Sequence, residues 1–260
     1  MKRHTYTEIE KLLASSNAED VQRGLEMVQA QSADADAQCC SDLYDLLASL
    51  LYIDPLDRPD LVPVLEGAIS AVAELGEPII PTLIKSLESG DVKAEMAAAQ
   101  ALGQMGGLAI GPLLDEYRRA TDGAARTFIL YALSKIRQPE IVQAVPLAIE
   151  AAGAVDQELR DTATRSLGKF VEVVPPSLLM PQLRDRMYDA LMANVADANP
   201  VVRAKAVRSL GKLAKFGHLS DDQREELLIS VRSLLGEDEQ FEWDRAYIVR
   251  REAKEAQSYL

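Results

Sequence analysis

Residues 203–213 read Arg-Ala-Lys-Ala-Val-Arg-Ser-Leu-Gly-Lys-Leu, and residues 160–170 read Arg-Asp-Thr-Ala-Thr-Arg-Ser-Leu-Gly-Lys-Phe. The two stretches agree at the leading Arg, at the Ala three residues later, along the run Arg-Ser-Leu-Gly-Lys, and in the apolar last residue. Their apolar residues recur three and four positions apart, which is the spacing of one face of an α-helix. Two such similar helices in one chain indicate an internal repeat.

Weaker copies of this helix surround the pair. The anchor leucines are Leu75, Leu102, Leu133, Leu167 and Leu210, at intervals of 27, 31, 34 and 43 residues. Because the motif is kept while the interval varies, we expect helix pairs that are joined by loops of different length. Small residues near the anchor leucines predict close contact between helices. Three of them are alanines on the buried stripe, and three are glycines directly after a leucine. They are Ala163, Ala206 and Ala253, and Gly103, Gly168 and Gly211.

No segment alternates apolar and polar residues as a half-buried strand would, so the sequence predicts an all-α fold. We expect a right-handed α-solenoid, a superhelix of about six to seven antiparallel helix pairs. Residues 1–260 are expected to form a single domain, with divergent pairs in 1–60 and recognisable repeats in 61–260. Thr7-x-x-Glu10 is typical of a capping box that opens the first helix. The expected pairs are 5–14/17–31, 37–53/58–75, 78–88/92–105, 108–120/124–136, 139–152/156–172, 176–196/200–216 and 220–235/245–258.

The pattern of an apolar helix, a turn with Asp, and then Val-Arg-x-x-Ala-x-x-Ala-Leu-Gly resembles a HEAT repeat. Its short, Leu-Gly-rich form is similar to the HEAT-like repeats of phycobilisome lyases and their relatives, over roughly residues 60–260. The resemblance implies a ladder of Arg–Asp pairs from repeat to repeat, in which Glu95 takes one arginine position. The positions that match this ladder are Arg126, Arg160, Arg203, Arg250, Asp156, Asp197 and Asp244.

Composition limits the functional classes. Of 260 residues, 48% are hydrophobic and 27% charged, which provides a core and excludes disorder along the whole chain. The net charge of −13 disfavours wholesale binding to nucleic acid or to an anionic membrane. No membrane span or secretory signal is expected, and the expected location is cytoplasmic. The charge is uneven, because residues 1–120 carry 9 basic and 20 acidic side chains whereas residues 160–215 carry 10 and 5.

The second helix of each pair carries a stripe of polar residues two positions before and after the anchor leucine. Residues four apart share a helix face, and in HEAT-like folds the second helices line the concave surface. The stripe changes from Gln100 and Gln104 to cations toward the C-terminus. We therefore expect a binding surface for an acidic protein partner, formed by Tyr131, Lys135, Arg165, Lys169, Lys205, Arg208 and Lys212. The alternative is that these cations pair with acids of neighbouring helices, such as Asp161 or Asp189.

The sequence contains no phosphate-binding loop, nucleophile elbow or HExxH motif, and its two histidines, His4 and His218, form no metal-ligand pattern. We expect no catalytic residue, no metal and no cofactor. Cys39 and Cys40 are adjacent and cannot easily bridge; one is expected to be buried and the other half-exposed. Trp243 and Phe241 are expected to cover the end of the core, or else to anchor a partner.

Three functions compete. The favoured one is a non-catalytic protein-interaction scaffold, because solenoids present an extended surface and nothing in the chain requires catalysis. The resemblance also permits a subunit of a bilin lyase-type enzyme that attaches or detaches a chromophore. A HEAT-like DNA glycosylase is a more distant alternative, and its signature would be salt-dependent DNA binding. The identity of the partner and the oligomeric state are left open.

Overall fold

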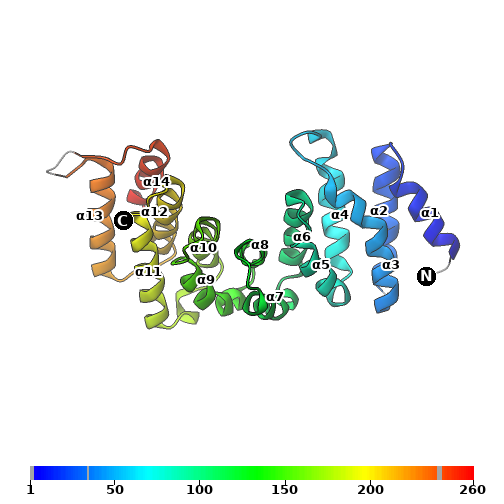
Figure 1. The fold of residues 1–260 in the computed structure, drawn as a ribbon, viewed down its shortest axis with the longest axis horizontal. Helices are drawn as coiled ribbons and strands as arrows, with labels where there is room; N and C mark the ends of the chain where they lie inside the picture. Colours follow the sequence, from blue (N-terminus) through cyan, green and yellow to red (C-terminus); the bar gives the residue numbers. More distant parts are fainter. Residues whose placement is uncertain (1–2, 34, 239–241) are drawn as a thin grey trace. The chain divides into compact units, whose positions relative to one another are not determined.

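The computed structural model describes residues 3–33, 35–238 and 242–260, and over these residues all regular structure is helical. Figure 1 shows the helices in chain order. The chain divides into two compact units, Met1–Ala120 (unit 1) and Thr121–Leu260 (unit 2). In both units the helices stack as pairs, so the predicted all-α solenoid is confirmed.

Unit 1 contains seven α-helices within the described residues. Its second helices pack in series, α2 against α4 and α4 against α6, while α5 packs against α7. Short 3-10 turns at Ala48–Tyr52, Pro59–Leu61 and Glu77–Ile79 extend the helix ends. The bounds are α1 Arg3–Leu13, α2 Ala18–Ser32, α3 Ala37–Leu47, α4 Val62–Glu74, α5 Ile80–Ser86, α6 Val92–Met105 and α7 Gly107–Arg119.

Unit 2 repeats this arrangement. The helices α8, α10, α12 and α14 each pack against the next, and α9 packs against α11. Turns of 3-10 helix lie at Pro139–Ala144 and Pro176–Leu178. The bounds are α8 Gly123–Leu133, α9 Val145–Ala151, α10 Gln157–Phe170, α11 Pro181–Val195, α12 Pro200–Lys215, α13 Asp221–Leu235 and α14 Tyr247–Gln257.

The repeat motif forms the core of each unit. All five anchor leucines are buried, as are the alanines at 163, 206 and 253. A methyl group on Gly168 of α10 would lie 2.8 Å from Ser209 Cβ and 2.9 Å from Ser209 Cα of α12. One on Gly211 would lie 3.0 Å from Ala256 Cβ of α14. The glycines are therefore required because neighbouring second helices nearly touch at these positions.

Two predicted helix starts differ from the structure. Thr7 lies inside α1, which already runs from Arg3, so the predicted capping box there is wrong. A reciprocal capping box instead opens α13 at Ser220. The helix expected from residue 176 begins at Pro181, because Met180 precedes a proline and adopts φ −57° and ψ 142°, outside the helical region.

No single helix in the described part of the chain is long and apolar enough to cross a membrane. The segments Pro59–Glu74 and Glu77–Ser86 reach the necessary length and composition only when counted together, and they are bent by 104° at their junction.

Candidate functional site

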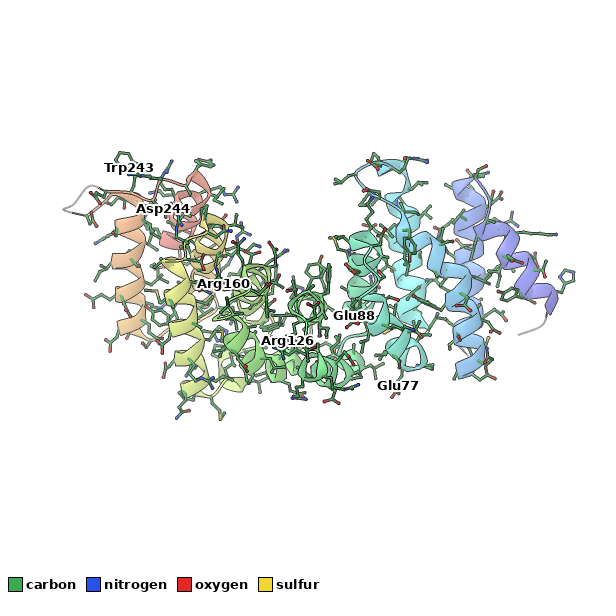
Figure 2. All side chains as sticks on the ribbon, viewed as in Figure 1. Glu77, Glu88, Arg126, Arg160, Trp243 and Asp244 are labelled. Atoms are coloured by element: carbon green, nitrogen blue, oxygen red, sulfur yellow. The ribbon has the colours of Figure 1, made fainter. Side chains whose placement is uncertain are left out.

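Arginines near the start of the second helices bind two neighbouring loops in unit 2. Arg160 donates from Nε to Asp197 Oδ2 of the next repeat at 2.6 Å, and from its terminal nitrogen to the carbonyl of Ala154 at 2.8 Å. Arg203 does the same with Asp244 at 2.7 Å and the carbonyl of Asp197 at 2.8 Å. Figure 2 labels Arg160 on α10 and Asp244 on the segment that precedes α14. These bonds tie each repeat to the next.

The aspartates of the ladder have two different roles, and the sequence spacing distinguishes them. Asp122 and Asp156 precede their arginine by four residues and are the N-caps of α8 and α10. Asp197 and Asp244 precede theirs by six residues and lie two residues before the cap. The bond from Arg160 lowers the pKa of Asp197. Thus Asp122 and Asp156 cap the helices that carry their arginines, whereas Asp197 and Asp244 accept the arginine of the preceding repeat.

Arg250, the last arginine of the ladder, binds its own preceding loop. Arg250 donates to the carbonyl of Asp244 at 2.7 Å, which is the same loop contact that Arg160 and Arg203 make. In unit 1, Glu95 occupies the arginine position, is buried, and accepts the backbone N–H of Gly90 at 2.8 Å. A carboxylate at this position therefore accepts a backbone N–H of the preceding loop, whereas an arginine at this position donates to backbone carbonyls of that loop.

The cations expected at the partner surface lie on the second helices of unit 2, except Lys135, which follows α8. Most of them form intramolecular ion pairs. Lys205 of α12 pairs with Asp161 of α10. Arg208 forms two bonds to the buried carboxylate of Glu252 on α14, at 2.8 and 2.6 Å. The alternative of pairing with neighbouring acids is therefore realised for these residues, through Asp161 and not through Asp189.

Three cations converge on the carboxylate of Glu172, just after α10. Lys212 approaches at 2.6 Å, Arg137 at 2.7 Å and Lys169 at 3.1 Å. Burial raises the pKa of Glu172, but the bonds from these three cations outweigh it and lower the pKa to about 2. Burial lowers the pKa of Lys212, Glu172 opposes this, and the nearby charges of Lys169 and Arg208 lower it further. One negative charge therefore neutralises only one of the three positive charges.

We call the eight residues Lys135, Arg137, Arg165, Lys169, Lys205, Arg208, Lys212 and Lys215 the cation ridge. Within the described residues, their acidic partners are Asp161, Glu172 and Glu252, so the ridge keeps an excess of positive charge. Lys135 lies 4.6 Å from the ring centre of Tyr131, and Arg165 is exposed. Lys135, Arg165 and Lys215 show no ion pair in this part of the chain, and these three can bind an incoming anion without losing an internal partner.

Sequence reasoning missed Arg137, Glu172 and Glu252. Arg137 and Glu172 follow their helices and lie outside the helical periodicity that defined the stripe. Glu252 was detectable, because it occupies the register of Lys205 when Arg250 is aligned with Arg203. A carboxylate at that position of α14 lies where it can meet the Arg208 side chain of α12.

The other candidate residues do not form a site. In the described residues, no group of three or more His, Cys, Asp or Glu side chains could hold a metal ion. Cys39 and Cys40 are both free; Cys40 is buried and Cys39 partly exposed, as predicted. His218 is buried after α12, and burial lowers its pKa. Trp243 is 60% exposed, so the expectation that it covers the end of the core is wrong. Figure 2 labels Trp243 on the segment between α13 and α14. Phe241 lies outside the described residues.

Comparison with known proteins supports the fold. No protein-family model matches the chain, and no curated protein matches it in sequence. The complex of CpcE and CpcF of phycocyanin lyase from Nostoc sp. PCC7120 is similar to 69% of this chain and 98% of the other, with TM-score 0.55 and 23% identity. The karyopherin Kap121p bound to the SUMO protease Ulp1p matches 98% of this chain, with TM-score 0.62 and 14% identity, although the match spans only 29% of that protein.

An engineered protein matches 99% of this chain and 68% of its own length, with TM-score 0.52 and 18% identity. All three identities are below 25%, so these matches establish the fold. The chain has the fold of a HEAT-like repeat protein, and in fold it resembles the lyase group.

Proposed function

We propose that the chain is a non-catalytic protein-interaction scaffold and that the cation ridge of unit 2 binds an acidic protein surface. The observation that carries the proposal is the convergence of Arg137, Lys169 and Lys212 on the single carboxylate of Glu172. Three cations without an ion pair among the described residues lie on these second helices or, for Lys135, directly after one. Such an excess of positive charge, in a chain of net charge −13, favours an anionic partner.

The pattern of charge favours a protein over a nucleic acid. Asp161, Glu172 and Glu252 are interspersed among the cations at fixed positions. A continuous phosphate backbone would be repelled by these carboxylates as it crosses the repeats. A protein surface can place its acids opposite the unpaired cations and its hydrogen-bond donors opposite the carboxylates. Rigid stacked repeats also present side chains without a large cost in ordering.

The test reverses charges that have no internal ion pair, so that the fold is preserved. Lys135→Glu with Arg165→Glu changes the ridge. Lys11→Glu with Lys85→Glu is the matched control, because it reverses the same number of exposed charges in unit 1. Tagged wild type and both variants are used for affinity capture from native extract, at low and raised salt, and the captured proteins are identified and their charge distribution determined. Circular dichroism checks that the helical content is unchanged.

We expect an acidic protein that is retained by wild type and by the control, lost with the ridge variant, and lost as salt rises. A set of captured proteins that is the same for all three chains would overturn the proposal. Capture of a chromophore-bearing protein with visible absorbance would favour the bilin lyase-type alternative, and salt-dependent binding to DNA would favour the glycosylase alternative. Either result would replace the scaffold proposal.

A further inference from the structure

The exposed apolar side chains of unit 1 gather on two segments, the loop between α3 and α4 and the first turns of α6. Among the described residues of this unit, five large apolar side chains are exposed, and one of them, Leu108, lies apart in α7. The other four are between 40% and 90% exposed, and we call them the apolar patch; they are Tyr52, Leu56, Val92 and Met96. Exposed apolar side chains that lie together are typical of an interaction site.

The loop that carries Leu56 has a fixed shape. The carboxylate of Asp54 accepts the backbone N–H of Leu56 at 2.9 Å, and the carbonyl of Asp54 accepts that of Arg58 at 2.9 Å. The Arg58 side chain forms two bonds to Asp60, at 2.9 and 2.7 Å. These bonds hold Leu56, which is 90% exposed, at the tip of a closed turn. Little ordering is therefore required when a partner binds there.

The loop and α6 are joined directly, so the four side chains belong to one surface. Lys93 Nζ of α6 lies 2.6 Å from Asp54 Oδ2, and the 3-10 turn Ala48–Tyr52 packs against α6. Met96 follows Lys93 by three residues and Val92 by four, so all three share one side of the helix. The apolar side chains of α6 thus lie next to the side chain that binds the loop.

Acidic side chains surround the apolar patch. Residues 52–61 and 91–96 contain five acids and two cations. The pKa of Lys93 is raised by its bond to Asp54 and further by the charges of Asp57 and Asp91, so three carboxylates lie near one ammonium. Asp91 caps α6, and Asp57 has no ion pair among the described residues. The surface therefore keeps negative charge after its internal ion pairs are formed.

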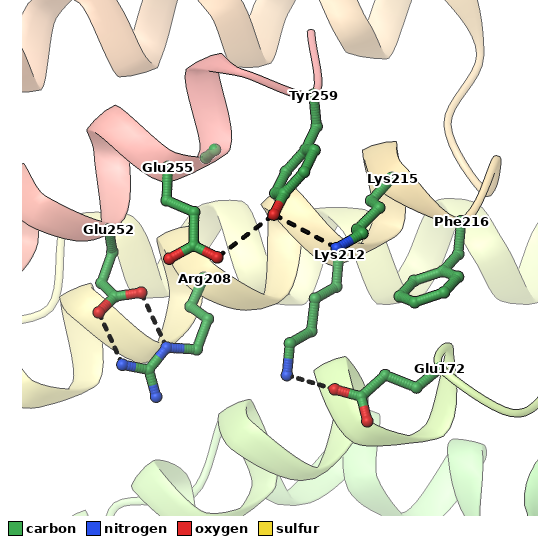
Figure 3. A pocket seen from close by; sticks show the side chains of 10 residues that line it. Glu172, Arg208, Lys212, Lys215, Phe216, Glu252, Glu255 and Tyr259 are labelled. Atoms are coloured by element: carbon green, nitrogen blue, oxygen red, sulfur yellow. Dashed lines mark hydrogen bonds and ion pairs between the residues drawn. The ribbon is translucent and has the colours of Figure 1, made fainter.

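A cavity of unit 2 shows the opposite case, in which charges are matched within the chain. It lies between α12 and α14, has a volume of about 100 Å³, and is lined by three cations and three acids. Figure 3 shows two of these cations in ion pairs with carboxylates, which are Arg208 with Glu252 and Lys212 with Glu172. Beside the apolar patch, in contrast, the acids outnumber the cations.

We propose that the apolar patch binds a basic amphipathic segment of a partner protein, which places an apolar side chain against Leu56 and Met96 and a Lys or Arg near Asp57. Exposed carboxylates beside exposed apolar side chains complement such a segment in both charge and polarity. A two-fold contact with a second copy fits less well, because it would place the same acids opposite each other. The inference goes beyond the proposed function, since it adds a surface in unit 1 that does not depend on the cation ridge.

The test measures binding of a fluorescein-labelled peptide of about 14 residues, with leucines at helical spacing and lysines between them, by fluorescence anisotropy on the full chain. Leu56→Ser removes the most exposed side chain of the patch. Leu108→Ser is the matched control, because it removes an exposed leucine of the same unit outside the patch. We expect the peptide Kd to rise about tenfold with Leu56→Ser and less than about twofold with Leu108→Ser. Equal effects would overturn the patch as the binding surface.

A second peptide with glutamate in place of every lysine keeps the apolar face and tests the charge. We expect it to bind about tenfold more weakly than the lysine peptide, and equal binding would overturn the assignment of a basic partner. Asp57→Asn should raise the Kd of the lysine peptide about threefold, while Glu26→Gln, at an exposed acid of α2, should leave it unchanged. Equal effects of these two variants would show that only the net charge of the chain matters and would overturn the local role of Asp57.

Sedimentation velocity without peptide tests a second copy as the occupant. We expect the same sedimentation coefficient for wild type and Leu56→Ser; a wild-type dimer that dissociates with Leu56→Ser would overturn the proposal. Leu56→Ser should leave capture of the acidic protein unchanged, and the variant Lys135→Glu with Arg165→Glu should still bind the lysine peptide. The patch and the cation ridge can therefore fail separately.

Discussion

Units 1 and 2 stack helix pairs by the same rule but differ in what joins one pair to the next. In unit 2, Arg160 and Arg203 each reach an aspartate of the following repeat, and Gly168 lets adjacent helices touch. In unit 1, Glu95 binds only its own preceding loop. Unit 1 also carries 9 basic and 20 acidic side chains, whereas unit 2 carries 19 and 21.

The comparison shows that the apolar part of a repeat and its charged part can vary independently. The buried leucines and alanines are present in both units and are sufficient for stacking. The ladder position carries an acid in α6 (Glu95) and an arginine in α10 and α12, and helix pairs form in both cases. The charge of the second helices can therefore differ between the units, and unit 2 carries the cations on them.

The largest effect is expected where the helices of unit 2 touch. Gly168→Ala places a methyl group against the backbone of Ser209, and overpacking of this kind costs about 3 kcal/mol. Urea unfolding followed by circular dichroism reports on the helices of both units, so that the variants of each unit can be compared. As the matched control, Gly111→Ala in α7 of unit 1 meets nothing within 4 Å and is expected to stabilise its helix by up to about 1 kcal/mol. Equal effects at the two glycines would contradict the close packing of α10 on α12.

The second prediction breaks one rung of the ladder. Asp244→Ala leaves the guanidinium of Arg203, which is only 18% exposed, without its carboxylate, and is expected to lower the free energy of unfolding by about 2 kcal/mol. Asp60→Ala in unit 1 removes the exposed partner of Arg58 and should leave the unfolding midpoint unchanged. Urea titrations monitored by circular dichroism compare the two variants. If Asp244→Ala also left the free energy of unfolding unchanged, the ladder would have no stabilising role.

The third prediction concerns acid. The pKa of Glu172 is lowered from 4.5 to about 2, so the folded state favours the charged form. Its contribution is present above pH 4.5 and is lost as the pH falls from 4.5 toward 2, and it amounts to about 2 kcal/mol after allowance for solvent screening. Unfolding titrations between pH 7 and pH 3 should show that Glu172→Gln is destabilised at pH 7 and that its difference from wild type shrinks as pH falls. A difference independent of pH would show that Glu172 acts through packing alone.

The smallest effect is expected at the substituted rung of unit 1. Glu95→Gln keeps an oxygen acceptor for the Gly90 N–H and should change stability by less than about 0.5 kcal/mol. Glu95→Ala leaves that donor without its acceptor and should cost about 1 kcal/mol. Thermal unfolding of both variants separates the two cases. If Glu95→Gln is as damaging as Glu95→Ala, the charge rather than the hydrogen bond is what unit 1 requires.

Much of the fold could be predicted from the sequence because the repeat encodes it locally. The spacing of the anchor leucines placed the helix pairs, and the glycine after the leucine predicted close helix contact. The start of α11 was missed because it depends on the backbone of Met180 before Pro181. The helix expected at 5–14 is present as Arg3–Leu13, but its capping box was wrong because Thr7 and Glu10 have the spacing of a capping box and lie inside the helix.

The candidate site was only partly predictable, since pairing between helices depends on three-dimensional register. The stripe rule found Arg165, Lys169, Arg208 and Lys212, all on regular helices. It could not show that Glu172, located after a helix end, would attract three cations from separate segments. Nor could it separate paired cations from unpaired ones, and that distinction decides which residues are available to a partner.

We propose that unit 2, and not unit 1, presents the binding surface for acidic protein groups. Lysine acetylation footprinting of the full chain, with and without a hexaglutamate peptide and measured by mass spectrometry, compares the two units. We expect the peptide to protect Lys135, Lys169, Lys212 and Lys215 in unit 2 and to leave the labelling of Lys11, Lys85 and Lys93 in unit 1 unchanged. Protection shared equally by the lysines of both units, or absent from all of them, would contradict it.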